Sequence, residues 1–271
     1  PVHHCTNKND GTDDTDFSYI YFGNYPQSEV TDEATIQAID SAISQGVGQA
    51  AGTAENSEGI DVLVNGIKYR RISKDDTNNS YGFDKVPNNG YRYFKWERIK
   101  WRVLQNDGST LFVIAAKAVD CKEYNEEFVN ITWENSTIRS WLNNSFYNTA
   151  FSSSEQDAIV MQNVDNPEDV VEGGNNTNDN IYLLSISEVT NETYGFCSDS
   201  STYSMSRRMK TSDYANARGA SSGNEGKCYW WLRSRIRDRE DPEVVDAANV
   251  DSSGYAGRSG YSVYFNNGGV C

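Results

Sequence analysis

Residues 229–234 read Tyr-Trp-Trp-Leu-Arg-Ser, and residues 247–255 read Ala-Ala-Asn-Val-Asp-Ser-Ser-Gly-Tyr. The first stretch is a rigid aromatic anchor. The second consists of short strand-like pieces separated by Ser, Gly, Asn and Tyr, the residue types from which adaptable recognition surfaces are often built. The C-terminal segment 229–271 therefore predicts a ligand-binding face, and it favours binding over catalysis.

The adjacent tryptophans, Trp230 and Trp231, could stack on a carbohydrate or belong to the core. Neighbouring residues of a strand point to opposite faces of its sheet, so at least one of the two is expected in the core, and both can be. The arginines at 233, 235, 237 and 239 alternate and would share one face. That face is equally consistent with ligand recognition and with charge balance on an acidic protein.

Apolar residues at helical spacing predict two main helices. Thr31-Asp-Glu-Ala offers an N-terminal cap, and the isoleucines that follow repeat every three to four residues up to Gly46, which predicts a helix over 32–44. A second stripe, within residues 132–151, contains Ile138, Trp141, Leu142, Phe146 and Ala150. Shorter helices are expected at 153–160, which begins with a capping signature, and at 211–217.

Alternating and β-rich runs predict a largely antiparallel set of strands. Residues 17–25 should form a strand that ends in a turn at Gly23 and Pro26, and Asn65-Gly66 should join two strands within 62–72 as a hairpin. Residues 93–104 should pair with 111–117. A strand is also expected at 181–184, after a mobile polar loop at 163–179. The fold class predicted from these elements is α+β.

Length and charge limit the organisation and the partners. A β-rich chain of 271 residues can form one domain, so we expect a flexible lead at 1–16 and a single domain over 17–271. The formal net charge of −15 opposes binding to nucleic acid and to anionic membrane surfaces. No apolar run approaches the length of a membrane span. The polar, acidic start favours an exported, cell-surface or extracellular protein.

Cysteine and histidine usage excludes several chemistries. The five cysteines contain no Cys-x-x-Cys pair, and the most favoured disulfide joins Cys197 to Cys228, with free buried thiols as the alternative. The only histidines are His3 and His4, so the remainder of the chain has no histidine base for Ser-His or Cys-His catalysis. A carboxylate pair of the glycosidase type stays formally possible. Calcium is also possible, through acidic loops at 165–179 and 238–246.

Six motifs in one order, the third of them in two adjacent parts, support a resemblance that covers residues 17–271. They are Tyr21–Val30, Ile99–Leu104, Ser136–Asn144, Phe146–Phe151, Tyr194–Phe196, Thr211–Ala215 and Trp230–Ser234. The set resembles a family of surface-associated gut-bacterial domains of unknown function. That family is similar to the C-type-lectin-like fold in its formylglycine-generating-enzyme-like form. Some of its members resemble the variable proteins of diversity-generating retroelements, whose C-terminal segment is rewritten to change binding specificity.

The resemblance implies twisted antiparallel sheets with two main helices, long loops, and a ligand face made by the last strands. The implied scaffold is Trp101, Trp141, Trp230, Trp231, Leu232 and Arg233. The implied exposed ligand-binding residues are Arg235, Arg237, Arg239, Asn249, Asp251, Tyr255, Arg258, Tyr261, Tyr264 and Asn266. The sequence departs from the family where Arg235-Ile236 replaces Pro-Gly, and at its end, Gly269-Val270-Cys271, where a closing strand is usual.

These observations predict a non-enzymatic, receptor-like or adhesin-like surface protein. It would bind a protein or a glycan through its C-terminal segment and could be the variable protein of a retroelement. A calcium-assisted lectin of fixed specificity is the first alternative, and a carboxylate-based hydrolase is the second. The reactive cysteine pair of the enzymes that share this fold has no counterpart in the sequence.

Overall fold

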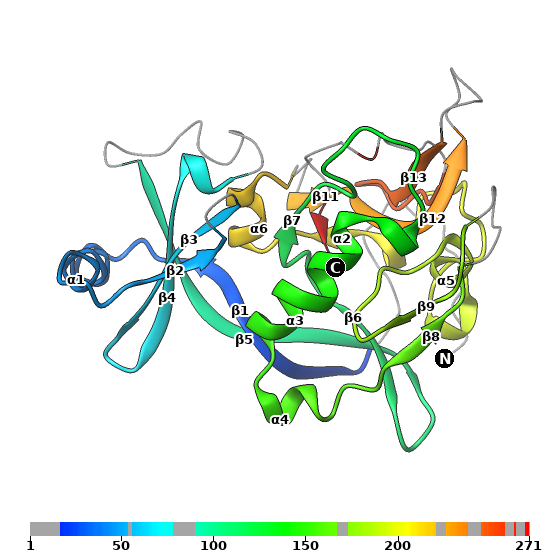
Figure 1. Ribbon diagram of the computed structural model, residues 1–271. Helices are drawn as coiled ribbons and strands as arrows, with labels where there is room; N and C mark the ends of the chain where they lie inside the picture. Colours follow the sequence, from blue (N-terminus) through cyan, green and yellow to red (C-terminus); the bar gives the residue numbers. More distant parts are fainter. Residues whose placement is uncertain are drawn as a thin grey trace.

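A computed structural model describes residues 17–53, 56–77, 90–166, 173–220, 226–237, 245–257, 263 and 269–270, without the side chains of Arg237 and Val245. The chain is a mixed α+β protein with mostly antiparallel sheets and short helices, as the sequence predicts (Figure 1). The predicted lead at 1–16 lies outside the described residues.

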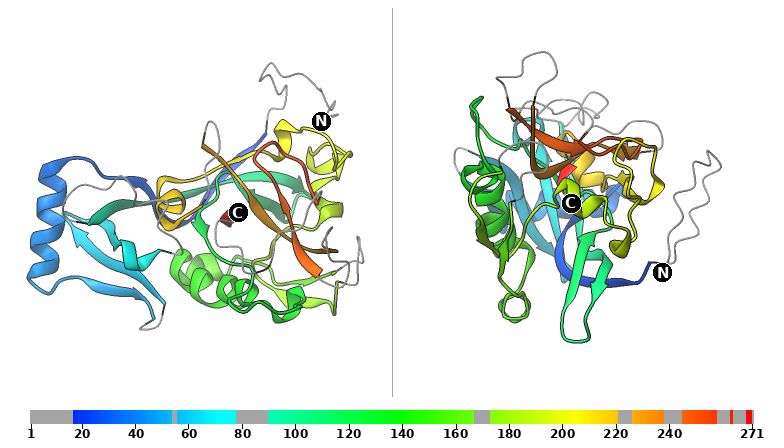
Figure 2. Two further views of the ribbon diagram at one scale, coloured as in Figure 1. Left: turned by 90° about the horizontal axis from the view of Figure 1, so that it is seen from above. Right: turned by 90° about the vertical axis from the view of Figure 1, so that its right-hand side faces the viewer.

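The largest sheet has the order β1-β5-β4-β3-β2, and β6 also pairs with β5. The bounds are β1 (Tyr19–Glu29), β2 (Gln49–Gly52), β3 (Ser57–Val64), β4 (Ile67–Ser73), β5 (Tyr91–Asn106) and β6 (Leu111–Ala115). One half of β5 pairs with β4 and the other half pairs with β6. This long strand therefore connects an N-terminal unit, formed by β2, β3, β4 and α1 (Glu33–Ser44), to the rest of the molecule (Figure 2).

Helix α1 confirms the first predicted helix and closes the outer face of the N-terminal unit. The Asp32 carboxylate accepts a hydrogen bond from the Thr35 backbone N–H at 2.8 Å and caps the first turn. Farther along, Asp40 accepts hydrogen bonds from Arg71 on β4 and from the Tyr93 hydroxyl on β5. Ile39 is completely buried. Apolar burial and the polar contacts of Asp40 thus fix the helix against the sheet.

The hairpin between β3 and β4 is also confirmed. Asn65 has a φ of 51° and Gly66 a φ of 77°, so both turn residues adopt the left-handed conformation that a tight two-residue hairpin turn requires. Strand β1, in contrast, does not end at Gly23 and Pro26. Its register with β5 shifts at these two places, and the strand continues to Glu29, because bulges absorb the residues that the sequence indicates as a turn.

The second predicted helix is confirmed as a helical run with one π-helical turn. It consists of α2 (Thr137–Trp141), the π turn η4 (Leu142–Phe146) and α3 (Tyr147–Ala150). Ile138, Leu142, Phe146 and Ala150 are buried, and Trp141 packs against the same core. The next helix, α4 (Ser153–Gln156), has the predicted capping box but is shorter than the predicted 153–160.

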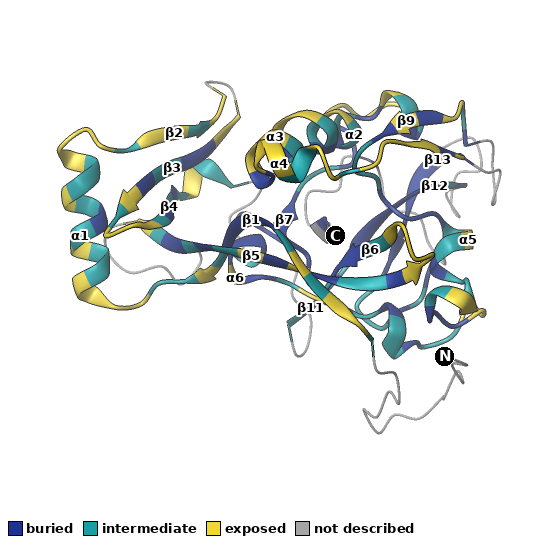
Figure 3. Cartoon of the chain, turned by 90° about the horizontal axis from the view of Figure 1, so that it is seen from below, coloured by how far each residue is buried: buried dark blue, intermediate teal, exposed yellow. Residues whose placement is uncertain are grey.

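The second sheet has the order β13-β12-β14-β7. Its strands are β7 (Asp120–Cys121), β12 (Trp230–Arg237), β13 (Val245–Val250) and β14 (Gly269–Val270). β14 runs parallel to β12 and antiparallel to β7. The β12–β13 ribbon is buried over most of its described length (Figure 3). Its register shifts between Trp231 and Arg235, where the Arg233 N–H donates to the Leu184 carbonyl instead.

The remaining elements are short. They are β8 (Gln162–Val164), β9 (Thr177–Asp179), β10 (Met209–Lys210), β11 (Lys227–Cys228), α5 (Ile186–Val189), α6 (Asp213–Arg218), and 3-10 turns at Lys74–Asp76, Trp133–Asn135, Glu192–Tyr194 and Met205–Arg207. Helix α6 confirms the helix predicted near 211–217. Where a mobile loop was predicted at 163–179, β8 and β9 form a two-stranded sheet, and residues 167–172 are outside the described part.

The predicted strand at 181–184 is wrong. Apart from the Leu184 carbonyl, which accepts from the Arg233 N–H of β12, side chains provide the hydrogen bonds to its backbone groups. The Asn143 amide accepts from the Ile181 N–H and donates to the Ile181 carbonyl, and the Arg233 guanidinium donates to the Leu183 carbonyl. Since buried backbone groups need partners but not one particular kind of partner, this β-rich sequence lies in an irregular segment.

The predicted disulfide between Cys197 and Cys228 is also wrong. Cys228 is a free thiol, buried on β11, and burial raises its pKa to about 12. Cys197 is disulfide-bonded, but to a partner outside the described residues. Cys121 is buried and free as well. Cys197 and Cys228 flank one long loop-like segment in the sequence. Their positions in the sequence do not determine which thiols lie close enough in space to form a disulfide.

Candidate functional site

Strand β12 carries the aromatic anchor, and both of its tryptophans lie in the core. The Trp230 indole N–H donates to the Arg207 carbonyl at 3.1 Å, and the Trp231 indole N–H donates to the Lys122 carbonyl at 2.9 Å. The two rings belong to different core clusters, on opposite sides of the strand. Leu232 is completely buried. With both indole groups satisfied internally, neither tryptophan offers a stacking surface to a ligand.

Arg233 is buried, and its guanidinium forms hydrogen bonds inside the protein. Its guanidinium donates to the carbonyls of Leu183 and Asp165 and to the Glu188 carboxylate. It therefore differs from Arg235, which is partly exposed and contacts Asn130. The register of β12 with β13 shifts between Trp231 and Arg235, so regular alternation does not hold across Arg233.

The remaining two residues of the implied scaffold lie in the same interior. Trp101 on β5 is buried and donates its indole N–H to the Phe22 carbonyl at 2.7 Å. Trp141 on α2 is partly buried and donates to the Glu58 carboxylate at 3.2 Å. Each scaffold tryptophan thus combines ring packing with one internal hydrogen bond.

The described members of the expected ligand-binding set do not form one surface. Asn249 pairs with Trp231 and is buried, which contradicts its predicted exposure. Asp251 accepts hydrogen bonds from the N–H groups of Ser253 and Tyr255 and so closes a turn. Arg237 lies on β12 with its side chain undescribed. Predicted ligand residues that fall outside the described part are Arg239, Arg258, Tyr261, Tyr264 and Asn266.

Arg235 and Asp251 lie toward opposite ends of the β12–β13 ribbon. Arg235 pairs with Ala247, whereas Asp251 follows Val250, which pairs with Trp230 at the other end. Four residues of extended chain separate Ala247 from Asp251, a distance of about 13 Å. The Asp251 end is tied down by the segment that precedes β10, because Arg207 donates to the Gly254 carbonyl and Arg208 to the Ser252 carbonyl.

A loop that the sequence did not single out lies beside Arg235. The Arg235 guanidinium donates to the side-chain oxygen of Asn130, in the segment between β7 and α2. In the same loop, Phe128 is 68% exposed and Val129 is 44% exposed. Arg235, Phe128, Val129 and Asn130 are called the ribbon-end surface below. The signal for it was present in the sequence, since Phe128-Val129 is an apolar pair inside a polar, aperiodic stretch, but only the structure places it next to the ribbon.

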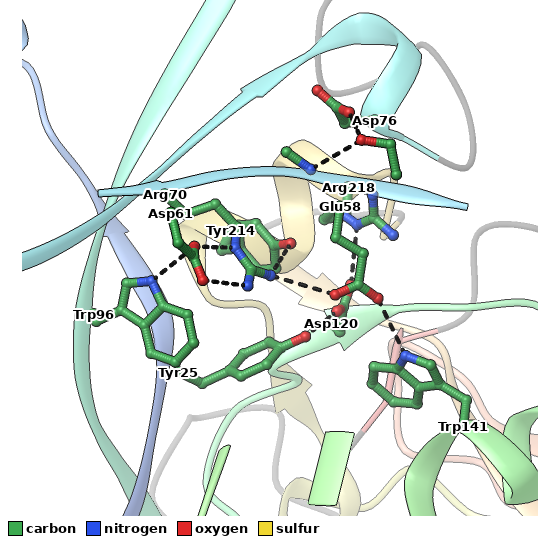
Figure 4. A network of polar contacts seen from close by, with 12 residues as sticks. Tyr25, Glu58, Asp61, Arg70, Asp76, Trp96, Asp120, Trp141, Tyr214 and Arg218 are labelled. Atoms are coloured by element: carbon green, nitrogen blue, oxygen red, sulfur yellow. Dashed lines mark hydrogen bonds and ion pairs between the residues drawn. The ribbon is translucent and has the colours of Figure 1, made fainter. Parts of the chain in front are cut away.

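A buried polar network occupies the junction between the N-terminal unit and the rest of the molecule (Figure 4). Its centre is Arg70, whose side chain is 1% exposed. Arg70 makes two hydrogen bonds to Asp61, at 2.7 and 3.0 Å, and a third to the Tyr214 hydroxyl at 3.1 Å. It also reaches Glu58 at 3.4 Å. The rings of Tyr25, Trp96 and Tyr214 surround its guanidinium at 5.1–5.8 Å.

Glu58 and a further acid, Asp120, extend the network into the second sheet and the helices. Glu58 accepts from Lys122 and from the Trp141 indole, each at 3.2 Å. Asp120 accepts from the Tyr25 hydroxyl at 2.6 Å and pairs with Arg218 at 3.3 Å. Every buried carboxylate in this network therefore has a cationic partner. The arrangement satisfies charges internally and joins β3 and β4 to the body of the protein.

The titration properties of the network agree with a structural role. Burial opposes ionisation of Glu58, but the charges of Lys122, Arg218 and Arg70 outweigh it and lower the pKa to about 2. Burial, assisted by neighbouring acids, holds the pKa of the Tyr25 hydroxyl well above its usual range. A carboxylate that stays ionised and fully paired is a poor general acid, and a phenol that stays protonated is a poor base.

The low pKa of Glu58 predicts an acid-dependent loss of stability. Its contribution is fully present above the unfolded-state pKa and disappears as the pH falls through about 2, because protonation breaks its ion pairs. Glu58→Gln removes the charge at every pH. We therefore expect the difference in unfolding free energy between wild type and variant to be about 3 kcal/mol near neutrality and to shrink toward zero at pH 2. Urea titrations across this range measure it, and a pH-independent difference would contradict the assignment.

The described residues contain neither a metal-binding group of side chains nor a membrane-spanning helix. Within the ranges described above, no three His, Cys, Asp or Glu side chains gather in a way that could hold a metal ion. In the first predicted calcium loop, the Asp179 carboxylate already accepts hydrogen bonds from the side chains of Trp133, Arg139 and Thr177. In the second predicted calcium loop, 238–246, residues 238–244 lie outside the described part. No helix in the described part is long and apolar enough to cross a membrane.

Comparison with known proteins identifies the family of this chain, and the function of that family is unknown. Residues 107–269 match the model of the Domain of unknown function (DUF6273). The match covers more than half of the chain, so the protein belongs to this family. No curated protein and no solved structure matches the sequence. The buried network spans the start of the family segment, because Glu58 and Arg70 precede residue 107 and Lys122 and Tyr214 follow it.

Proposed function

We propose that this chain is a non-enzymatic ligand-binding domain that recognises its ligand through the ribbon-end surface. The observation that carries the proposal is the hydrogen bond between Arg235 and Asn130. It joins the C-terminal ribbon to the loop that exposes Phe128 and Val129. An exposed aromatic side chain and an arginine that are linked through one loop, on a rigid support, have the composition of a protein-binding hot spot.

The rigid support is the β12–β13 ribbon. Trp230 and Trp231 are buried on both sides of β12, and Arg233 fixes its middle to the segment 183–188. A ligand can therefore be bound at the ribbon end without an ordering cost in the strands themselves. The ribbon stays in the core beyond Arg235, since Ile236, Ala247 and Val250 are buried as well.

The resemblance noted from the sequence motifs supports a more specific form of the proposal. The fold is of the C-type-lectin-like type, the protein is exported or displayed on a bacterial surface, and its C-terminal segment is the variable part of a diversity-generating retroelement. The ligand is a protein or a glycan on another cell or surface. The exposed apolar pair, Phe128 and Val129, favours a protein ligand over a sugar, since neither side chain can form hydrogen bonds.

The proposal is tested with a ligand captured by screening displayed peptide and protein libraries. Phe128→Ala and Arg235→Ala should each weaken binding of that ligand by about 30-fold, the effect typical of a hot-spot residue, while the melting temperature stays nearly constant. Met161→Ala and Lys117→Ala are matched controls, because Met161 and Lys117 are exposed apolar and basic residues elsewhere on the surface. Equal binding by all four variants would refute the proposed surface.

A further inference from the structure

A concave site that contains none of the four ribbon-end residues lies elsewhere in the described part of the molecule. It is a cavity of about 560 Å³ between the start of β1, the strand β6, the segment after α4, and residues 180–188. This volume is within the usual range for pockets that bind small molecules. Leu111 and Val160, both exposed, lie at its lining, whereas Trp101, Ile114 and Leu184 are buried. The cavity thus has a buried interior and an apolar rim.

Aromatic rings form two of its sides. On one side Phe151 packs against Phe22, with ring centroids 5.4 Å apart, and against Trp101 at 6.3 Å. On the other side Phe112 stacks on Tyr182 at 6.0 Å and meets Tyr194 edge-on at 5.3 Å. Such rings offer flat apolar surfaces, and the two tyrosines add hydroxyl groups on the Phe112 side.

Four uncharged polar groups accompany the rings. Tyr182, Tyr194, Gln105 and Asn180 are among the residues that line the cavity, and their hydroxyls and side-chain amides make no hydrogen bond to another described residue. Burial raises the pKa of Tyr182 to about 12, and burial with the nearby Glu188 charge raises that of Tyr194. Both hydroxyls therefore remain donors at neutral pH. Together the four groups can donate to and accept from a ligand that carries several hydroxyls.

The charges at the cavity select against an anion. Among the described residues that line it there is no Lys or Arg, and the acids are Asp107 and Glu188. Glu188 is paired with Arg233 and accepts from the Ser185 N–H. Asp107 accepts from Ser109 and Thr110 in its own turn. Both carboxylates are therefore satisfied within the protein, and the lining offers no cation to a phosphate or carboxylate ligand.

We infer that this cavity binds a neutral saccharide. A pyranose ring presents an apolar C–H face, which the rings of Phe112 and Phe22 can cover, and a set of hydroxyls, which the two tyrosines, Gln105 and Asn180 can bind. The site requires no calcium, and it is independent of the ribbon-end surface. The Glu188–Arg233 pair connects it to β12, so the same strand that supports the ribbon end also fixes one wall of the saccharide site.

The test uses a fixed panel of neutral sugars: glucose, galactose, N-acetylglucosamine, lactose, maltose and cellobiose, with glucose 6-phosphate as the anionic probe. Ligand-observed NMR and calorimetric titration up to about 10 mM detect binding in the affinity range of small uncharged ligands. We expect saturable binding of at least one neutral sugar and weaker or no binding of glucose 6-phosphate. No binding by the panel, or a preference for the phosphate, would overturn the inference.

Variants locate the binding. Tyr194→Phe and Asn180→Ala each remove one polar group and should weaken the sugar by about fivefold to tenfold. Phe128→Ala, at the ribbon end, is the control and should leave sugar affinity unchanged. Sugar binding that responds to Phe128→Ala but not to Tyr194→Phe would place the sugar at the ribbon end and refute the cavity site, whereas loss of protein-ligand binding alone leaves the cavity site intact.

Discussion

Replacing Arg70 with Ala should lower the free energy of unfolding by about 3–5 kcal/mol, because it removes the most deeply buried cation of the network and breaks two ion pairs at once. Arg70 is 1% exposed and forms ion pairs with Glu58 and Asp61. Its removal also takes the guanidinium away from three aromatic rings and leaves the Tyr214 hydroxyl without its donor. Urea unfolding at neutral pH measures the loss.

The matched control is Lys68→Ala, on the same strand. Lys68 also pairs with Asp61 and lies over the Trp96 ring, but its side chain is 41% exposed, so solvent screens its charge. Its loss should be below about 1 kcal/mol. A small effect of Arg70→Ala, equal to that of Lys68→Ala, would show that the network does not join the N-terminal unit to the body.

Trp231→Ala should cost about 3–5 kcal/mol, since it removes a large buried ring and leaves a cavity. The ring packs edge-on against Tyr124 at 5.8 Å, and its N–H satisfies the Lys122 carbonyl. The control is Phe128→Ala, which removes an exposed aromatic ring and should change stability by less than about 0.5 kcal/mol. Thermal unfolding of the two variants measures the contrast. A tolerated Trp231→Ala would mean that the anchor is not part of the scaffold.

Sequence patterns predicted those elements whose determinants are local. The helix α1 has its cap, its apolar spacing and its terminating glycine within fourteen residues or so, and the β3–β4 turn is specified by Asn65-Gly66. The segment 181–184 was mispredicted because its backbone partners, Asn143 and Arg233, are about 40 to 50 residues away. A local sequence pattern cannot show that distant side chains will form hydrogen bonds with these backbone groups.

The candidate site was predicted in part for the same reason. The tail composition drew attention to β12, and alternation assigned at least one of Trp230 and Trp231 to the core. Alternation could not show that the register of β12 with β13 shifts between Trp231 and Arg235, or that Asn249 faces inward. The loop that contains Phe128 is joined to Arg235 by the hydrogen bond to Asn130, between residues that are 105 positions apart in the chain. The buried network around Arg70 was not anticipated, because abundant acids on a strongly negative protein gave no reason to single out three of them.

Amide hydrogen exchange of the protein with and without its captured ligand tests the central claim most directly, because it needs no substitution. If recognition occurs at the ribbon-end surface, ligand binding slows exchange in the loop 126–131 and at residues 235–237, while the turn at 251–255 is unchanged. Protection confined to 251–255, or spread over the N-terminal unit with none at 126–131, would contradict the account.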